Sequence, residues 1–369
     1  MGSAALHHLA LRGLRAIGIE RATPGHEGSS SHGDSRAIRL AYFEHPSYVP
    51  LLRRAYDNWR DLERRTGERL LQVTGVLEAG PGGCALLEGS IRSCLEHELP
   101  HEQLTARQVA ERFPAFDLPA DWEAVIQPDG GFLRPERAIQ AHLKIALARG
   151  AETRLGQVVV GVEPRAGGAR VILADGGVID AGAVILAGGA WMGELAPVLA
   201  PRLTLTRQVL AWFEPARRDL VAPDRFPVFL LQTKDDLVYG FPDIDGAGVK
   251  AASHLPGRAL ARAGDARQDA TPEDADGVLA ALERLIPAAA GPVRSLRTCI
   301  YTHAPDGDFI LGPHPDWPQL VLASPCSGHG FKFASVIGEI LADLATTGAT
   351  PHDISRFAVD RFGPVAPDA

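Results

Sequence analysis

Two segments of the chain repeat apolar residues at the spacing of a helix. Near the N-terminus they recur every three or four positions, which predicts an amphipathic helix with one buried face. This stripe consists of Tyr48, Leu52, Ala55, Trp59 and Leu62. Gly67 is the expected end of that helix, because glycine readily takes the left-handed conformation. Residues 331–345 carry a second stripe, so we expect another helix there.

Other segments have the pattern of strands. Short alternating runs between residues 205 and 255 indicate an antiparallel sheet with one covered face. Apolar runs predict strands at residues 70–77, 183–187 and 319–323, with further helices at 84–95, after 105, at 135–150 and at 271–286. We expect residues 258–269 to form the one mobile loop. The mixture predicts an α/β fold with a second, α+β part built on the antiparallel sheet.

The start of the chain resembles the second half of a dinucleotide-binding βαβ unit. A helix is expected at residues 1–12 and a buried strand at residues 14–20, ending in Glu20. In such a unit the terminal carboxylate binds the adenosine ribose, and Gly2 corresponds to the last glycine of GxGxxG. The preceding strand and the first two glycines are missing from the sequence. We therefore expect the upstream DNA to encode them in frame.

Composition narrows the class of protein. With 369 residues the chain has room for about two domains. A net charge of −8 argues against a nucleic-acid partner. The longest apolar runs are too short to span a membrane, so we expect no membrane partner and a cytoplasmic location. No CxxC pair is formed by the cysteines, which stand at 84, 94, 299 and 326. We therefore expect no metal site and no disulfides.

Residues 299–340 contain the strongest candidates for chemistry. Cys299 lies in a predicted strand, and a glycine-rich turn with Gly328 and Gly330 leads into the helix that carries Lys332. Such a turn can present N–H groups to a ligand, although glycines before a helix more often serve tight packing. Gly188, at the carboxyl end of an apolar strand, stands where α/β sheets bind ligands.

Three separated motifs together resemble one family. They are SGHGFKFASVIGEI at residues 327–340 with Cys-Ile-Tyr-Thr at 299–302, SHGDSRAIR at 31–39, and YGFPDIDGAGVKAASH at 239–254. They are similar to segments of the monomeric sarcosine oxidase and N-methyl-L-tryptophan oxidase family. The resemblance implies an FAD-binding Rossmann-like domain, with FAD attached covalently to Cys299. It further implies that Arg39 and Lys332 bind the substrate carboxylate.

The same resemblance assigns the remaining site residues. It places His32, Ser35 and Arg36 beside the flavin ring, and it matches Tyr239, Lys250 and His254 to catalytic positions. Taken alone, Tyr239 is an ordinary sheet aromatic and His254 a satisfied polar residue. Lys250 is different, because an unpaired ammonium between Val249 and Ala251 in an apolar strand is costly. The implied role of Lys250 is to stabilise the charge that develops on O₂.

The resemblance implies a monomeric oxidase that demethylates an N-methyl amino acid with O₂, giving formaldehyde, the amine and H₂O₂. Its expected FAD-binding domain comprises residues 1–75, 135–200 and 298–369, and its substrate-binding domain comprises 76–134 and 201–297. Two alternatives stay open: a flavin dehydrogenase with another electron acceptor, and a flavin-free protein without catalysis. The substrate also stays open, although residues 131–139 and 209–215 look closer to the N-methyltryptophan branch.

Overall fold

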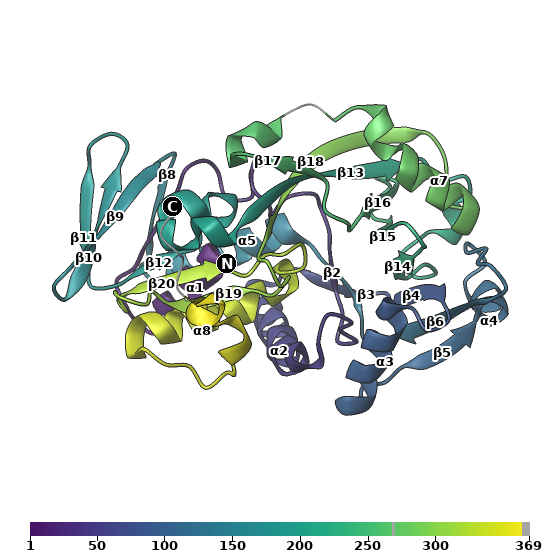
Figure 1. Ribbon diagram of the computed structural model, residues 1–369, viewed down its shortest axis with the longest axis horizontal. Helices are drawn as coiled ribbons and strands as arrows, with labels where there is room; N and C mark the ends of the chain where they lie inside the picture. The colour runs from purple at the N-terminus through teal and green to yellow at the C-terminus, as the bar shows by residue number, and fades with distance from the viewer. Residues whose placement is uncertain (268–269, 364–369) are drawn as a thin grey trace.

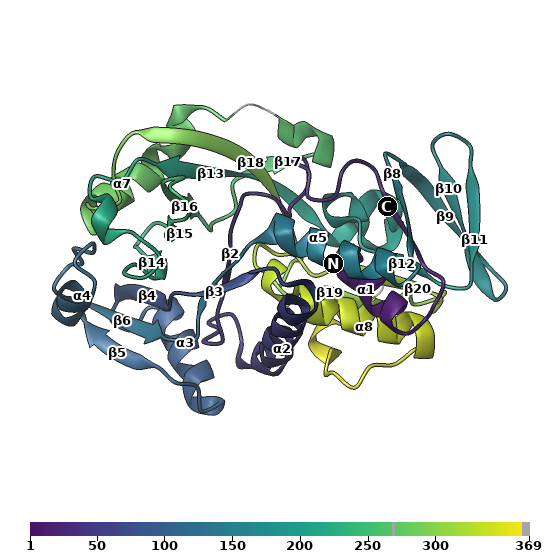
Figure 2. The same cartoon turned by 180° about the vertical axis from the view of Figure 1, so that it is seen from behind.

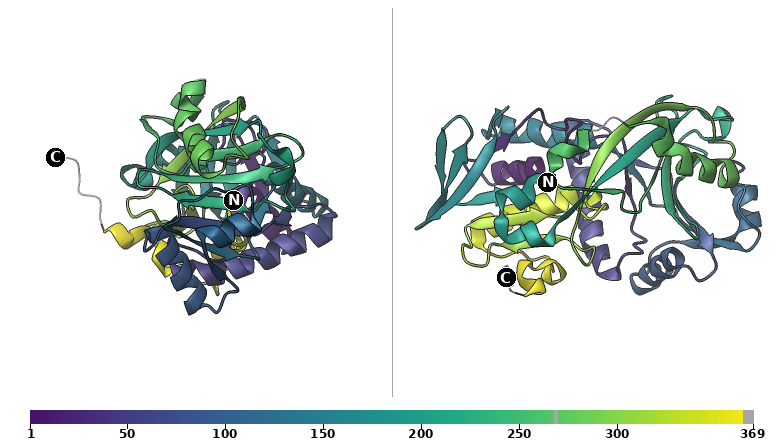
Figure 3. Two further views of the ribbon diagram at one scale, coloured as in Figure 1. Left: turned by 90° about the vertical axis from the view of Figure 1, so that its right-hand side faces the viewer. Right: turned by 45° about the horizontal axis from the view of Figure 1, so that its top comes forward.

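The computed structural model describes residues 1–267 and 270–363. Figure 1 shows an elongated molecule with a large sheet at one end and a small sheet of hairpins at the other. Figure 2 shows the same arrangement from behind. The right-hand view in Figure 3 shows the same separation of the ends. The predicted α/β class is confirmed. In the described residues no helix is long and apolar enough to cross a membrane.

The large sheet has nine strands and is almost entirely antiparallel. Its order is β17-β13-β16-β15-β14-β4-β6-β5, with β18 also paired to β13 and only β14 and β4 parallel. The strands are β4 (Val76–Pro81), β5 (Glu102–Thr105), β6 (Trp122–Gln127), β13 (Thr204–Phe213), β14 (Val228–Gln232), β15 (Leu237–Asp243), β16 (Val249–Ser253), β17 (Arg258–Leu260) and β18 (Val293–His303). The antiparallel sheet predicted for residues 205–255 is therefore confirmed.

Two small groups of parallel strands form the other part. β1 (Ile17–Glu20) pairs with β8 (Glu152–Leu155), and β12 (Val184–Leu186) pairs with β20 (Leu320–Ser324). β19 (Ile310–Pro313) joins β20 in antiparallel fashion. The prediction of a buried strand at residues 14–20 is wrong in its burial, because every residue of β1 is partly exposed and the strand lines a cavity.

Two three-stranded sheets complete the strands. β2 (Arg36–Ile38) and β3 (Leu71–Val73) flank β7 (Gly131–Leu133). β9 (Val159–Arg165), β10 (Gly168–Leu173) and β11 (Val178–Ala181) form the hairpins at the far end of the molecule (Figure 1). The single strand predicted at residues 70–77 is wrong, because Gly75 takes a φ of 77° and separates β3 from β4. Residues 258–260 form β17 within the predicted mobile loop, while 268 and 269 lie outside the described residues.

The helices agree with the predicted stripes. α2 ends at Gly67, which has the expected left-handed conformation with a φ of 74°. The helices are α1 (Gly2–Leu11), α2 (Val49–Thr66), α3 (Ala85–Glu96), α4 (Ala106–Arg112), α5 (Pro135–Ala148), α6 (Met192–Leu195), α7 (Asp276–Leu285) and α8 (Ala334–Thr347). α2 and α8 share the largest apolar core with residues of β19 and β20. This core supports the segment between β18 and α8, which carries the candidate residues.

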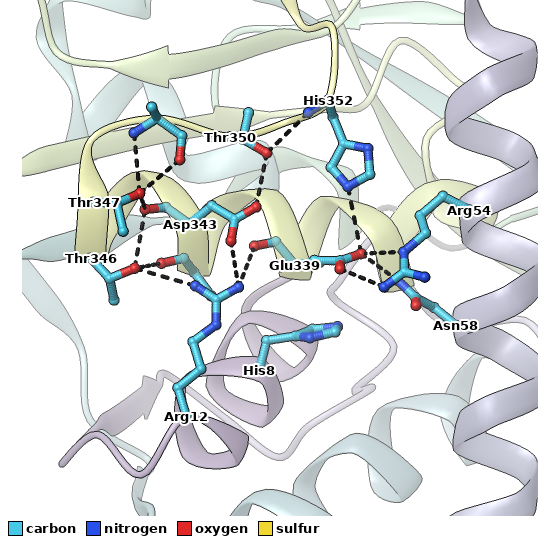
Figure 4. Close-up of polar contacts among 12 residues, drawn as sticks. His8, Arg12, Arg54, Asn58, Glu339, Asp343, Thr346, Thr347, Thr350 and His352 are labelled. Carbon is cyan, nitrogen blue, oxygen red and sulfur yellow. Dashed lines mark hydrogen bonds and ion pairs between the residues drawn. The ribbon is translucent and has the colours of Figure 1, made fainter.

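α1 lies directly against α8, and both apolar and polar contacts hold the pair. A Cβ added at Gly338 would lie only 2.4 Å from the Cβ of Ala4, so the two backbones meet at this glycine. Figure 4 shows the polar side of the contact, where Arg12 binds Asp343 at 2.5 Å. On the same face of α8, Glu339 binds Arg54 of α2 at 2.6 Å. α8 is thereby fixed to both neighbouring helices.

We predict that Gly338→Ala destabilises the fold by about 1–3 kcal/mol, because the added methyl group overlaps the backbone of α1. Gly277→Ala in α7 is the matched control, since no atom lies within 4 Å of a Cβ added there. Because Gly277 is exposed and helical, its substitution by alanine should raise the free energy of unfolding by about 0.5–1 kcal/mol. Urea unfolding monitored by circular dichroism measures both changes. Equal stability of the two variants would contradict the close contact.

Candidate active site

A single large cavity collects most of the predicted site residues. Its volume is about 1580 Å³, and it runs from the carboxyl end of β1 to the inner face of the large sheet. Its wall includes Glu20 at one end, Cys299 of β18 further along, and Lys332 at the start of the helical segment that leads into α8. Residues from opposite ends of the sequence therefore meet around one space.

Cys299 belongs to the strand that connects the two parts of the molecule. It pairs with Gln208 across the β13–β18 ladder, and its side chain is buried. The Arg36 guanidinium lies 4.0 Å from its Sγ atom. His32 is also buried, and its ring lies against the backbone of Thr298. Burial and then the Arg36 charge lower the pKa of His32 to about 4, so the ring is neutral near pH 7.

Lys250 is buried in β16 and is held by backbone oxygens. Its Nζ atom donates to the carbonyl oxygens of Gly33 at 2.6 Å and Ser35 at 2.9 Å, and to Ser35 Oγ at 3.2 Å. The Phe241 ring lies 4.7 Å away, and no carboxylate within the described ranges forms an ion pair with it. Burial, followed by the Arg36 charge, lowers the pKa of Lys250 well below its usual value. Ser35 and Lys250, which are distant in sequence, are thus in direct contact.

Arg39 is the centre of a buried ion cluster. Its Nη2 atom donates to Glu44 Oε2 at 3.0 Å, and its Nε atom lies 2.8 Å from Glu78 Oε1. Burial alone would lower the pKa of Arg39, but these two carboxylates raise it above the usual value. Burial raises the pKa of Glu78 to about 7. Glu44 and Glu78 are site residues that the sequence analysis missed.

Lys332 lies on the cavity wall close to this cluster. Its Nζ atom donates to the carbonyl oxygen of His329 at 2.7 Å, and burial, followed by the Arg39 charge, lowers its pKa to about 7. His329 in turn contacts the hydroxyl group of Tyr42 at 2.6 Å and the carbonyl oxygen of Gly307 at 3.0 Å. His329 therefore fixes the glycine-rich turn, a role that the sequence analysis missed.

Three rings form the wall near the large sheet. The hydroxyl groups of Tyr239 and Tyr301 lie 3.4 Å apart, and the His254 ring lies about 6 Å from both tyrosine rings. Tyr301 follows Cys299 by two positions in β18, so both side chains point to the same face of the strand. That spacing was the signal in the sequence that could have identified Tyr301.

The predicted glycines differ in what requires them. A Cβ at Gly330 would lie 1.7 Å from the carbonyl oxygen of Pro325, and one at Gly328 would lie 2.8 Å from the Tyr301 ring. Packing within the protein therefore requires these two glycines, whereas a Cβ at Gly188 would meet only the end of the Leu195 side chain, at 2.5 Å, which can move away. Gly2 borders the open cavity instead, and a Cβ added there would meet only the Ala187 side chain, at 3.9 Å.

The cavity fits an adenine dinucleotide. Glu20, at the end of β1, lines it with Oε1 accepting a hydrogen bond from the Ala22 amide at 3.1 Å. Nearby, the Arg21 guanidinium lies 4.3 Å from the centre of the Trp191 ring. Cys299 and Arg36 line the cavity further along, toward the large sheet. A long ligand with a sugar at one end and a polar ring system at the other matches this arrangement.

The paired parallel strands and the long cavity are typical of a dinucleotide-binding protein. The family model described as FAD dependent oxidoreductase matches residues 1–344. Monomeric sarcosine oxidase of Streptomyces avermitilis is 38% identical over 371 residues, covering 97% of this chain and 94% of the relative. N-methyl-L-tryptophan oxidase of Yersinia pestis is 34% identical over 364 residues, covering 98% and 96%.

A solved structure agrees with these matches. The open form of NikD, described as an unusual amino acid oxidase essential for nikkomycin biosynthesis, superposes with a TM-score of 0.85. It is 28% identical, and the match covers 96% of this chain and 94% of that chain. The chain therefore belongs to the family of FAD-dependent oxidoreductases that contains these amine oxidases. The predicted family membership is confirmed.

Proposed function

We propose that this FAD-dependent oxidoreductase is an oxidase that demethylates an N-methyl amino acid. The observation that carries the proposal is the presence of two buried cations, Arg39 and Lys332, on the wall of the cavity that also contains Cys299. A buried guanidinium beside an ammonium suits a carboxylate ligand. The names of the relatives, sarcosine oxidase and N-methyl-L-tryptophan oxidase, support an N-methyl amino acid as the ligand.

The side chains divide the work by charge. FAD, when bound, accepts two electrons from the substrate and passes them to O₂. Arg39 and Lys332 hold the carboxylate and thereby fix the orientation of the substrate in the cavity. Oxidation of the N-methyl group gives an imine, which water hydrolyses to formaldehyde and the amine. Lys250, through its charge, stabilises the negative charge that develops as O₂ is reduced to H₂O₂.

We also propose that FAD is attached through Cys299. The support is the position of Cys299 on the cavity wall, with the Arg36 guanidinium 4.0 Å from its sulfur. Cys326 also lines the cavity and offers an internal comparison. The division into two domains, the monomeric state and the cytoplasmic location stay predictions. The domain boundary proposed at residues 297 and 298 falls inside β18.

The proposed activity predicts H₂O₂ release in the presence of an N-methyl amino acid. Assays with sarcosine, N-methyl-L-tryptophan and pipecolate test it, with formaldehyde expected from the first two substrates only, since pipecolate has no N-methyl group. The parent amino acids glycine and L-tryptophan are the controls and should give at least tenfold less H₂O₂. Reduction of an artificial dye without H₂O₂ release would instead indicate a dehydrogenase. An inactive, colourless protein would indicate the flavin-free alternative.

Covalent attachment predicts that the flavin colour stays with the protein after acid precipitation. The peptide that contains residue 299 should carry the added mass of FAD in mass spectrometry. Cys299→Ser should release all of the colour into the supernatant, whereas the matched control Cys326→Ser should retain it. An unmodified thiol at residue 299 in an active, yellow enzyme would rule out the attachment.

For Lys250 we predict that Lys250→Met slows reoxidation of the reduced enzyme by O₂ about 10²–10³-fold, the scale for removing one electrostatic contact. Reduction by substrate without O₂ should change by less than about tenfold. Stopped-flow absorbance measures the two half-reactions separately. Lys234→Met, which removes a surface lysine, is the control and should change neither rate. Equal losses in both half-reactions would assign Lys250 a packing role.

A further inference from the structure

Glu78 is a buried carboxylate to which the proposed reaction assigns no role. It lies on β4 among apolar neighbours, with 1% of its surface exposed, and it does not line the cavity. Arg39 does line the cavity, and its Nε atom lies 2.8 Å from Glu78 Oε1. Ser90 of α3 donates a hydrogen bond to the other oxygen of Glu78. Arg39 and Lys332, the proposed ligands of the substrate carboxylate, are called the carboxylate clamp below. Glu78 contacts Arg39 on the side away from the cavity, out of reach of a substrate.

The charges around Arg39 are already balanced before a further anion binds. Arg39 and Lys332 supply two positive charges, and Glu44 and Glu78 supply two negative charges, so the fully ionised cluster is neutral. A substrate carboxylate that binds Arg39 adds one negative charge to this closed environment. An uncompensated charge in such an environment is strongly unfavourable. A proton must enter the cluster, or a carboxylate must leave it.

The two acidic residues are not equivalent. Burial alone would raise the pKa of Glu44, but chiefly the positive charge of Arg39, together with that of Lys332, holds it below its usual value. Glu44 also lines the cavity, whereas Glu78 is sealed behind Arg39. Burial raises the pKa of Glu78, and the negative charge of Glu44 adds to that effect. Glu78 is therefore the carboxylate on which a proton is held at the lowest cost.

We propose that Glu78 takes up one proton from solvent when a substrate carboxylate binds Arg39 and Lys332, and that it thereby sets the pH range of substrate binding as a positioning residue. The inference rests on the proposed function, because it requires that a carboxylate be the ligand of the clamp. Protonated Glu78 leaves Arg39 with one full charge to share between Glu44 and the substrate. Binding is then tight below the pKa of Glu78 and weakens above it.

The other titratable groups around Glu78 have fixed charges near neutral pH, except Lys332. Burial raises the pKa of Cys94 to about 12 and that of Tyr42 well above its usual value, so both stay neutral. Burial lowers the pKa of His329 to about 4, so that ring is neutral as well. Lys332, with a pKa of about 7, could itself take up a proton on carboxylate binding. The test must therefore remove this second source.

The substitution Lys332→Arg removes proton uptake at residue 332, because a guanidinium keeps its charge at every pH of interest. We would titrate the FAD-loaded Lys332→Arg enzyme with benzoate, a carboxylate without a titratable amine, by calorimetry in buffers of different ionisation heat. About one proton should be taken up per benzoate near pH 8, and Kd should rise about tenfold per pH unit above the pKa of Glu78. In Lys332→Arg/Glu78→Gln benzoate should still bind, with no proton uptake and a pH-independent Kd.

Ser90→Ala separates Glu78 from Glu44 as the proton acceptor, because Ser90 contacts only Glu78 of the two. Loss of this donor to the anion should move the pH profile of Kd up by about one pH unit. An unmoved profile, persistent uptake in the double variant, or no uptake in Lys332→Arg would overturn the role of Glu78. Failure of benzoate to bind any of these proteins would be a different result, since it would overturn the carboxylate clamp and with it the proposed function.

Discussion

The ladder between β13 and β18 is the interaction on which the rest of the structure depends. It joins residues 204–213 to residues 293–303 over nearly their whole lengths, with one irregularity between Trp212 and Phe213. At its N-terminal end β18 belongs to the large sheet, and beyond its C-terminal end the chain enters β19, the glycine-rich turn and α8. A change of register here would turn Cys299 and Tyr301 away from the cavity. One strand pairing thus sets the position of the candidate chemistry relative to the substrate wall.

The site is built by burying cations that have different kinds of partner. Arg39 is compensated by two carboxylates, whereas Lys250 and Lys332 donate to backbone carbonyl oxygens. Carbonyl oxygens satisfy the donors of an ammonium without cancelling its charge. The field of Lys250 therefore remains available to a reacting group, while that of Arg39 becomes available only when a neighbouring carboxylate is neutralised or displaced. The difference supports the proposed roles of Lys250 in the reaction with O₂ and of Arg39 in substrate recognition.

Sequence patterns predicted the elements that have a strong period and missed the details set by single residues. The apolar stripe of α2 and the alternation in the large sheet were sufficient to predict these elements, because burial of one face sets the spacing of apolar residues in each. The division at Gly75 was missed, since a turn within an apolar run leaves the period of the side chains unchanged. Glu78 was missed although it stands in an apolar strand as Lys250 does. Its partner Arg39 is 39 positions away, and only the fold brings the two together.

The packing around the glycine-rich turn affects which residues evolution can change in such chains. Gly328 and Gly330 are required because Tyr301 and the Pro325 carbonyl occupy the space of their missing side chains. Selection for a stable fold is enough to keep both glycines, whether or not a nucleotide ever occupies the cavity. A descendant that lost its redox chemistry would retain this signature for as long as it folded. The motif therefore records ancestry, and evidence for present activity must come from residues such as Cys299 and Lys250, for which we propose chemical roles.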